Sequence, residues 1–144
     1  MKRLVPTLAV CLALPGLALA DGGVATPYDG SFEDASFAVE SAIIEQGLVI
    51  DYVSHVGEML ARTGADVGSD KMLFKEADIF VFCSAVVSRQ VMEADPANIA
   101  HCPYGIYVAE TAAGITIGRR DYPDGPMEAV EDLLDKIIAS ALAE

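Results

Sequence analysis

The sequence predicts an α+β protein of two layers, in which a mainly antiparallel sheet is covered on one face by two helices. Three observations support this fold class. Short stretches rich in β-forming residues recur along the chain, two of them are joined by a tight turn, and long helical patterns lie near the start and at the end of the domain. The expected order of elements is β-α-β-β-(α)-β-β-α.

The first strand is predicted at 24–28 and the first helix directly after Ser31. Pro27 restricts this strand to a sheet edge, because proline cannot donate a hydrogen bond to a neighbouring strand. Ser31 followed three residues later by Asp34 resembles a capping box at a helix N-terminus. Gly47 is typical of a helix C-terminus and ends the pattern. The apolar residues that recur at helical spacing between these ends are Phe32, Ala35, Val39, Ala42 and Ile43.

A second strand is predicted at 48–53, where side chains should alternate between the two faces of the sheet. Leu48, Ile50 and Tyr52 are expected on one face and the intervening residues on the other. A helical turn at 58–62 follows, and a loop rich in glycine and serine then leads toward the next apolar block. The first predicted helix is therefore followed directly by the second predicted strand.

The centre of the chain predicts a buried strand and then a helix. Residues 79–83 form an apolar block rich in β-formers, which is typical of a buried strand. Residues 84–94 have helical character, and Asp95 with Pro96 closes that helix.

The last third of the chain predicts a hairpin and a final helix. Strands at 104–110 and 115–119 are joined by a turn at Ala113 and Gly114. A turn after the hairpin places Pro126 near the start of the last helix, a position that proline favours. The apolar stripe of this helix consists of Val130, Leu133, Leu134, Ile137, Ile138 and Ala141.

The N-terminal segment predicts export. Lys2 and Arg3 form a short basic head, an apolar stretch follows, and small residues at a cleavage site end at Ala20. Prolines and a glycine interrupt the apolar stretch, which is shorter than the roughly 20 residues of a spanning helix. We therefore expect a signal peptide at 1–20, a single domain at 21–144, a periplasmic or secreted location, and no stable membrane insertion after cleavage.

The strong acidity of the chain restricts its partners. The formal net charge is −13, and the predicted signal carries two of the nine basic residues and none of the 22 acidic ones, which leaves 7 − 22 = −15. Nucleic acid and anionic membranes require a basic face, so neither is an expected partner. A protein or small-molecule partner stays open, and exposed sheet edges are compatible with a homodimer.

Cys83 and Cys102 are the strongest candidates for chemistry. In an oxidising compartment two cysteines most simply form a structural disulfide, although an exchangeable redox pair or two free thiols also fit. Cys83 closes one expected strand and Cys102 opens a later one, so antiparallel pairing would bring the two thiols together. Cys83 also precedes a helix, whose N-terminus would lower the pKa of a thiol.

Histidines, methionines and arginines supply weaker candidates. His101 adjoins Cys102, and a set of Cys, His and Met suits copper(I) or zinc, with a solvated His101 as the alternative. His55 and Met59 are four residues apart and would share a helix face, but a hydrogen-bonded structural histidine and a core methionine also fit. The doublet at 119–120 could hold an anion or be a solvated strand end.

Four short motifs follow one another as they do in the domain-of-unknown-function family DUF302. They are Phe82-Cys83-Ser84, Met92-Glu-Ala-Asp-Pro96, Cys102-Pro103 and Tyr107-Val-Ala-Glu110, and His55 falls where that family often has a histidine. The likeness extends over about 24–141, so the chain resembles a member along its whole expected domain. The resemblance implies a two-layer α+β fold with a TATA-binding-protein-like arrangement, and it implies no established activity.

No recognisable catalytic or cofactor motif is present, so no cofactor is expected and an enzyme is the less favoured class. Three hypotheses remain. The first is an exported, non-enzymatic binding or accessory protein of the periplasm. The second is a thiol-based redox or sulfur-handling protein that uses Cys83 and Cys102. The third is a soft-metal protein that binds copper or zinc.

Overall fold

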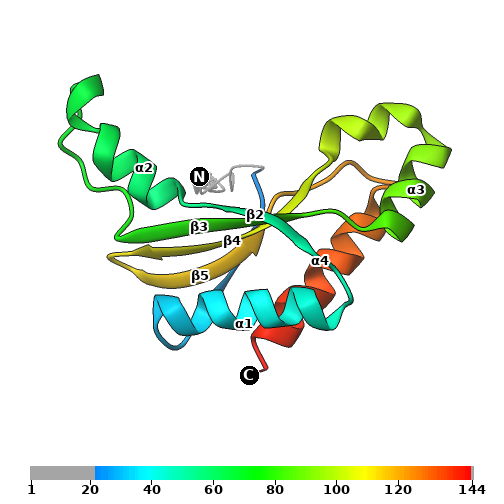
Figure 1. Cartoon of the computed structure of the whole chain (residues 1–144), viewed down its shortest axis with the longest axis horizontal. Helices are drawn as coiled ribbons and strands as arrows, with labels where there is room; N and C mark the ends of the chain where they lie inside the picture. The colour runs from blue at the N-terminus through cyan, green and yellow to red at the C-terminus, as the bar shows by residue number, and fades with distance from the viewer. Residues whose placement is uncertain (1–21, 144) are drawn as a thin grey trace, which may run out of the picture.

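The computed structural model describes residues 22–143, so the predicted signal peptide at 1–20 and its cleavage site lie outside the described residues. Figure 1 shows one sheet with helices below it and at its two ends. The elements in chain order are β1 (Val24–Tyr28), α1 (Phe32–Glu45), β2 (Ile50–Ser54), α2 (Val56–Thr63), η1 (Ala65–Val67), β3 (Glu76–Phe82), α3 (Ala85–Ala94), η2 (Pro96–His101), β4 (Tyr104–Thr111), β5 (Gly114–Arg119) and α4 (Glu128–Ala141).

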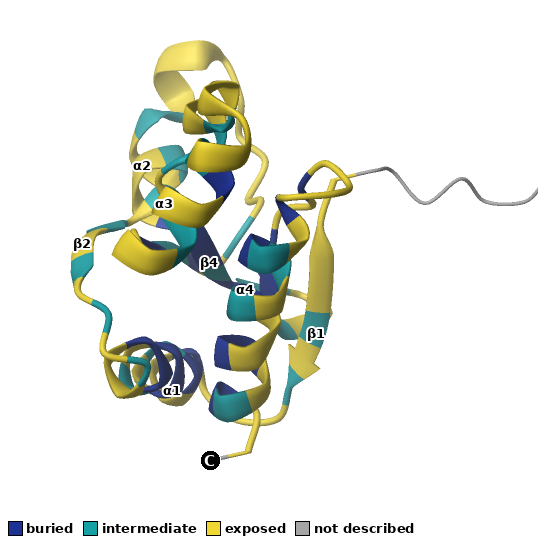
Figure 2. Ribbon diagram, turned by 90° about the vertical axis from the view of Figure 1, so that its right-hand side faces the viewer, coloured by how far each residue is buried: buried dark blue, intermediate teal, exposed yellow. Residues whose placement is uncertain are grey.

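The sheet confirms the predicted fold class. Its five strands lie in the order β1-β5-β4-β3-β2, and every neighbouring pair is antiparallel. Helices α1 and α4 pack against each other and cover one face of the sheet, as Figures 1 and 2 show from two directions. No helix among residues 22–143 is long and apolar enough to cross a membrane.

The start of α1 shows how the local sequence determines an element. The Ser31 hydroxyl accepts a hydrogen bond from the Asp34 backbone N–H at 3.0 Å, and the Asp34 carboxylate accepts one from the Ser31 N–H at 3.3 Å. These two bonds form the predicted capping box and satisfy two of the free N–H groups of the first turn. At the other end Gly47 has a φ of 73°, which glycine adopts without strain.

The core lies between the helices and one face of the sheet. Alternate strand residues such as Phe80, Ile106 and Ile117 point toward the helices and are buried. The stripe predicted for the last helix is confirmed, because Val130 and Leu134 are fully buried and Leu133 packs against their edge. Figure 2 shows the buried sides of α1 and α4 turned toward each other and toward the sheet.

The predicted facing of the second strand is wrong. Ile50 pairs with Phe82 but Tyr52 pairs with Val81, so the strand contains one extra residue at this point. Such a bulge interrupts the alternation of side chains between the two faces. As a result Ile50 and Val53 pack against the core together, whereas Tyr52 is 57% exposed.

Candidate functional site

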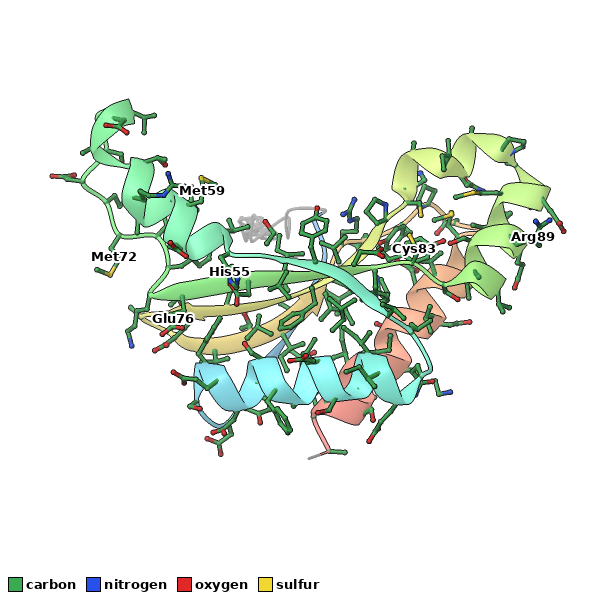
Figure 3. All side chains as sticks on the ribbon, in the orientation of Figure 1. His55, Met59, Met72, Glu76, Cys83 and Arg89 are labelled. Atoms are coloured by element: carbon green, nitrogen blue, oxygen red, sulfur yellow. The ribbon has the colours of Figure 1, made fainter. Side chains whose placement is uncertain are left out.

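The two cysteines meet at one end of the sheet. Cys83 directly follows β3 and Cys102 lies two residues before β4, and these strands pair with Phe82 opposite Tyr104. The Cys83 and Cys102 sulfur atoms lie 3.0 Å apart, and both residues are free thiols. The closeness expected from the antiparallel pairing is therefore present. Figure 3 shows Cys83 where β3 leads into α3.

The electrostatics of Cys83 differ from the expectation. Ser84 is the N-cap of α3, and its hydroxyl accepts the Val87 N–H at 3.3 Å, so Cys83 lies one residue outside the helix. Although Cys83 is an exposed residue, desolvation of its sulfur, the hydrogen bond and charge of Cys102, and the Asp51 carboxylate raise the pKa of its thiol to about 11. The predicted lowering of this pKa by the helix N-terminus is therefore wrong.

A hydrogen bond ties α3 to β4 beside the thiols. The Ser88 and Tyr104 hydroxyl oxygens lie 3.1 Å apart, and Tyr104 is only 1% exposed. Burial raises the pKa of Tyr104, so its hydroxyl stays protonated at neutral pH. This bond fixes the helix that begins next to Cys83 against the strand that begins next to Cys102.

An aromatic cluster adjoins the thiol pair on the side of Cys102. The Tyr122 ring packs edge-on against Tyr104 at 6.2 Å and against His101 at 6.0 Å between ring centroids. The Arg120 guanidinium carbon lies 6.0 Å from the centre of the Tyr122 ring. Tyr122 is 7% exposed, and its hydroxyl is buried with no hydrogen-bond partner among the described residues. Burial raises the pKa of Tyr122 to about 12.

His101, the residue before Cys102, does not take part in the contact between the two cysteines. His101 ends η2 and packs against Tyr122, whereas Cys102 contacts Cys83. In the described part of the chain, no three side chains of His, Cys, Asp or Glu converge on a point that could hold a metal ion. Binding of a soft metal at His101 and Cys102 stays a prediction.

His55 lies at the opposite end of β3 from the cysteines, as Figure 3 shows. It is the N-cap residue of α2, and its Nδ1 lies 2.7 Å from the Asp78 Oδ1. This contact favours the interpretation of a hydrogen-bonded structural histidine at a strand end. Met59 is 42% exposed, so its expected place in the core is wrong.

A hollow beside α2 is also remote from the thiols. A volume of about 430 Å³ lies between α2, η1 and the segment that leads to β3, with Leu60, Met72 and Phe74 in its lining. Figure 3 shows Met72 at the α2 end of the molecule and Cys83 well away from it, where the sheet meets α3. The thiol pair is the stronger candidate because it brings reactive groups into contact, which the hollow does not.

The expectation of a solvated doublet at 119–120 is wrong for Arg119. This side chain is buried, and it donates to both oxygens of Asp135 at 2.6 and 2.9 Å and to Glu131 at 2.8 Å. The two carboxylates bind the guanidinium of Arg119 and raise its pKa above the ordinary value. Two features of the sequence could have predicted this ion pair. Glu131 and Asp135 are four residues apart and so share one helix face. Arg119 continues the alternation that turns Ile115 and Ile117 toward the core.

Comparisons with known proteins agree with the fold and name no activity. The family model described as "Domain of unknown function DUF302" matches residues 24–141. A solved structure described as an uncharacterized conserved protein DUF302 from Bacillus stearothermophilus is similar, with a TM-score of 0.65 and 15% sequence identity. The similarity covers 84% of this chain and 95% of that chain. No curated protein is similar enough to count as a match.

Proposed function

We propose that this chain, which belongs to the DUF302 family, is an exported accessory protein. It would work by thiol–disulfide exchange through Cys83 and Cys102. The observation that supports this function is the 3.0 Å distance between the two sulfur atoms. A disulfide bond is about 2.05 Å long, so the sulfurs need to approach by only about 1 Å. Strand pairing on one side and the Ser88–Tyr104 hydrogen bond on the other hold both thiols in place.

The exchange conserves atoms and electrons. One cysteine thiolate attacks a sulfur of the partner's disulfide, forms a mixed disulfide and releases one partner thiolate. The second cysteine then attacks the protein sulfur of that mixed disulfide and releases the other partner thiolate. The protein thus loses two electrons and two protons and gains the Cys83–Cys102 bond, while the partner's disulfide becomes two thiols.

The raised pKa of Cys83 favours one direction of this exchange. A pKa of about 11 keeps its thiol protonated at neutral pH. A strongly oxidising pair has a stabilised thiolate in its reduced form, because that stabilisation favours reduction of its disulfide. Cys83 lacks this stabilisation, so we propose that the dithiol acts as the electron donor. Its exposed position makes it accessible to a partner.

The export proposal rests on the N-terminal sequence. A basic head, an apolar stretch and an A-x-A site support cleavage after Ala20. N-terminal sequencing of the exported protein should begin at Asp21. Retention of Met1 in the exported form would contradict this part of the proposal.

A redox titration tests the thiol function. The mature protein is equilibrated with graded ratios of reduced and oxidised dithiothreitol, free thiols are alkylated, and the product is weighed by mass spectrometry. Wild type should lose both alkylation sites together in one two-electron transition. The variants Cys83→Ser and Cys102→Ser should show no such transition, and each should form a mixed disulfide when it is treated separately with oxidised glutathione. Independent alkylation of both wild-type thiols under every condition would contradict the proposal.

A further inference from the structure

We propose that Arg120, supported by the Tyr122 ring that packs against His101, recognises the carboxylate of an anionic low-molecular-weight disulfide that the Cys83–Cys102 dithiol reduces. This inference rests on the proposed function and names the substrate class of the same site. The feature that motivates it is an exposed cation on an aromatic platform that continues from the thiol pair.

The platform connects to the thiols through contacts of known length. Arg120 lies over the Tyr122 ring at 6.0 Å, and Tyr122 contacts His101, which directly precedes Cys102 in the chain. The Cys102 sulfur is in turn 3.0 Å from that of Cys83. Arg120 lowers and Cys102 raises the pKa of the Tyr122 hydroxyl.

Arg120 is available for an external anion, whereas its neighbour is not. Arg119 is buried and bound by Glu131 and Asp135, and Asp121 also approaches Arg119, at 3.6 Å. Arg120 is exposed and makes no ion pair within residues 22–143. A guanidinium presents a planar set of donors that fits a carboxylate with two parallel hydrogen bonds. The aromatic ring beneath it limits its motion.

The Tyr122 hydroxyl is a buried polar group that the fold leaves unpaired within residues 22–143. Buried hydroxyls nearly always have a hydrogen-bond partner, but this one has none among the described residues. Because burial raises its pKa to about 12, the hydroxyl is a neutral donor at physiological pH. The hydroxyl is fully covered, so Tyr122 supports Arg120 through its ring and not through a hydrogen bond to the substrate.

Charges on the two sides of the thiol pair would orient such a substrate. Asp51 acts on Cys83 and raises the pKa of its thiol, so this side of the pair is negative. Arg120 lies over the Tyr122 ring, and Tyr122 packs against His101, the residue before Cys102. An anionic group should avoid Asp51 and lie against Arg120, which directs the disulfide of the substrate across the two cysteine sulfurs. The rest of the chain is strongly acidic, so an anion is favoured only locally.

The chemistry is the exchange already described, with the substrate defined. The protein dithiol and one anionic disulfide give one protein disulfide and two anionic thiols, with two electrons passing to the substrate sulfurs. Arg120 forms no covalent bond in this reaction and acts only by binding the carboxylate, while Tyr122 and His101 support its position.

The test compares three small disulfides that differ mainly in charge. They are dithiodiglycolate, which is anionic, hydroxyethyl disulfide, which is neutral, and cystamine, which is cationic. Reduction by the pre-reduced mature protein is followed by release of substrate thiol. The readout is the ratio of the anionic rate to the neutral rate, measured at low and high salt, because this ratio cancels any general change in thiol reactivity.

Arg120→Gln should lower this ratio about threefold at low salt, which is the scale of one exposed ion pair, and high salt should remove most of the difference. Arg62→Gln is the matched control, because Arg62 is an exposed arginine on α2 at the far end of the sheet, and it should leave the ratio unchanged. An unchanged ratio in Arg120→Gln, or an equal fall in Arg62→Gln, would overturn the inference while leaving the proposed function intact. Failure to reduce even the neutral disulfide would overturn both.

Discussion

Arg119 and Asp135 form a two-point ion pair that joins β5 to α4. The Arg119 Nε lies 2.6 Å from Oδ1 and its Nη2 lies 2.9 Å from Oδ2 of Asp135. Glu131 adds a third contact and also accepts the Tyr122 backbone N–H at 3.0 Å. The network therefore holds the helix, the last strand and the segment that carries Tyr122 in one arrangement beside the thiol pair.

Weakening this pair should destabilise the fold. Asp135→Asn keeps the shape of the side chain but removes its charge, so we expect the free energy of unfolding to fall by about 1 kcal/mol, a value limited by the half-exposed position of Asp135. Urea denaturation measures the change. Asp132→Asn is the control, because Asp132 is an exposed carboxylate on the same helix without an ion pair among the described residues. Equal stability of the two variants would contradict this role for Asp135.

Oxidation of the thiol pair should stabilise the protein. The bond closes a segment of 102 − 83 = 19 residues, and the loss of loop entropy in the unfolded chain is worth on the order of 3 kcal/mol. The urea midpoint of oxidised wild type should therefore exceed that of reduced wild type. The double variant Cys83→Ser with Cys102→Ser should be insensitive to reductant. A midpoint of wild type that does not depend on redox state would mean that no bond forms or that strain cancels its effect.

Cys83 should react slowly with iodoacetamide at neutral pH, because its pKa is about 11. In the reduced protein the labelling rate should rise with pH up to that value. Cys102→Ser removes the thiol that raises this pKa, so the labelling profile of Cys83 should move to lower pH, although desolvation continues to oppose ionisation. Peptide mapping by mass spectrometry identifies the labelled residue. Fast labelling at mildly acidic pH would show that the thiolate is stabilised after all.

The same shift makes the reduced fold less stable at high pH. The folded pKa of Cys83 lies above the ordinary value of 9.0, so between about pH 9 and pH 11 the folded chain holds a proton that the unfolded chain has lost. Stability should therefore be complete below about pH 9 and should decrease as pH rises through this window. Denaturation of reduced wild type and of Cys83→Ser across this range isolates the effect, and parallel curves would contradict it.

Two tyrosines that touch each other should respond in opposite ways to loss of the hydroxyl. Tyr104→Phe removes the partner of Ser88 and should lower the free energy of unfolding by about 1 kcal/mol. Tyr122→Phe removes a buried hydroxyl without a partner among the described residues and should leave stability unchanged or increase it by up to about 1 kcal/mol. Thermal and urea unfolding of both variants decides between these outcomes. A loss at Tyr122 equal to that at Tyr104 would reveal a hydrogen bond that stabilises the fold.

The sequence alone was enough to predict the elements that depend on local signals. The Ser31–Asp34 capping box, the glycine after α1, the hairpin of β4 and β5 and the stripe of α4 each depend on residues close together in the chain. The meeting of Cys83 and Cys102 also followed from sequence, because antiparallel strands bring their adjoining ends together.

Tertiary structure alone decided the environment of each group. The bulge that turns Tyr52 outward arises from its pairing with β3, and Arg119 becomes a buried ion-pair centre only when α4 packs across the sheet. The pKa of Cys83 depends on desolvation and on Cys102 and Asp51, none of which the adjacent helix start reveals. Local sequence determines backbone conformation within a few residues, but burial, charge and hydrogen bonding depend on segments that fold together from distant parts of the chain.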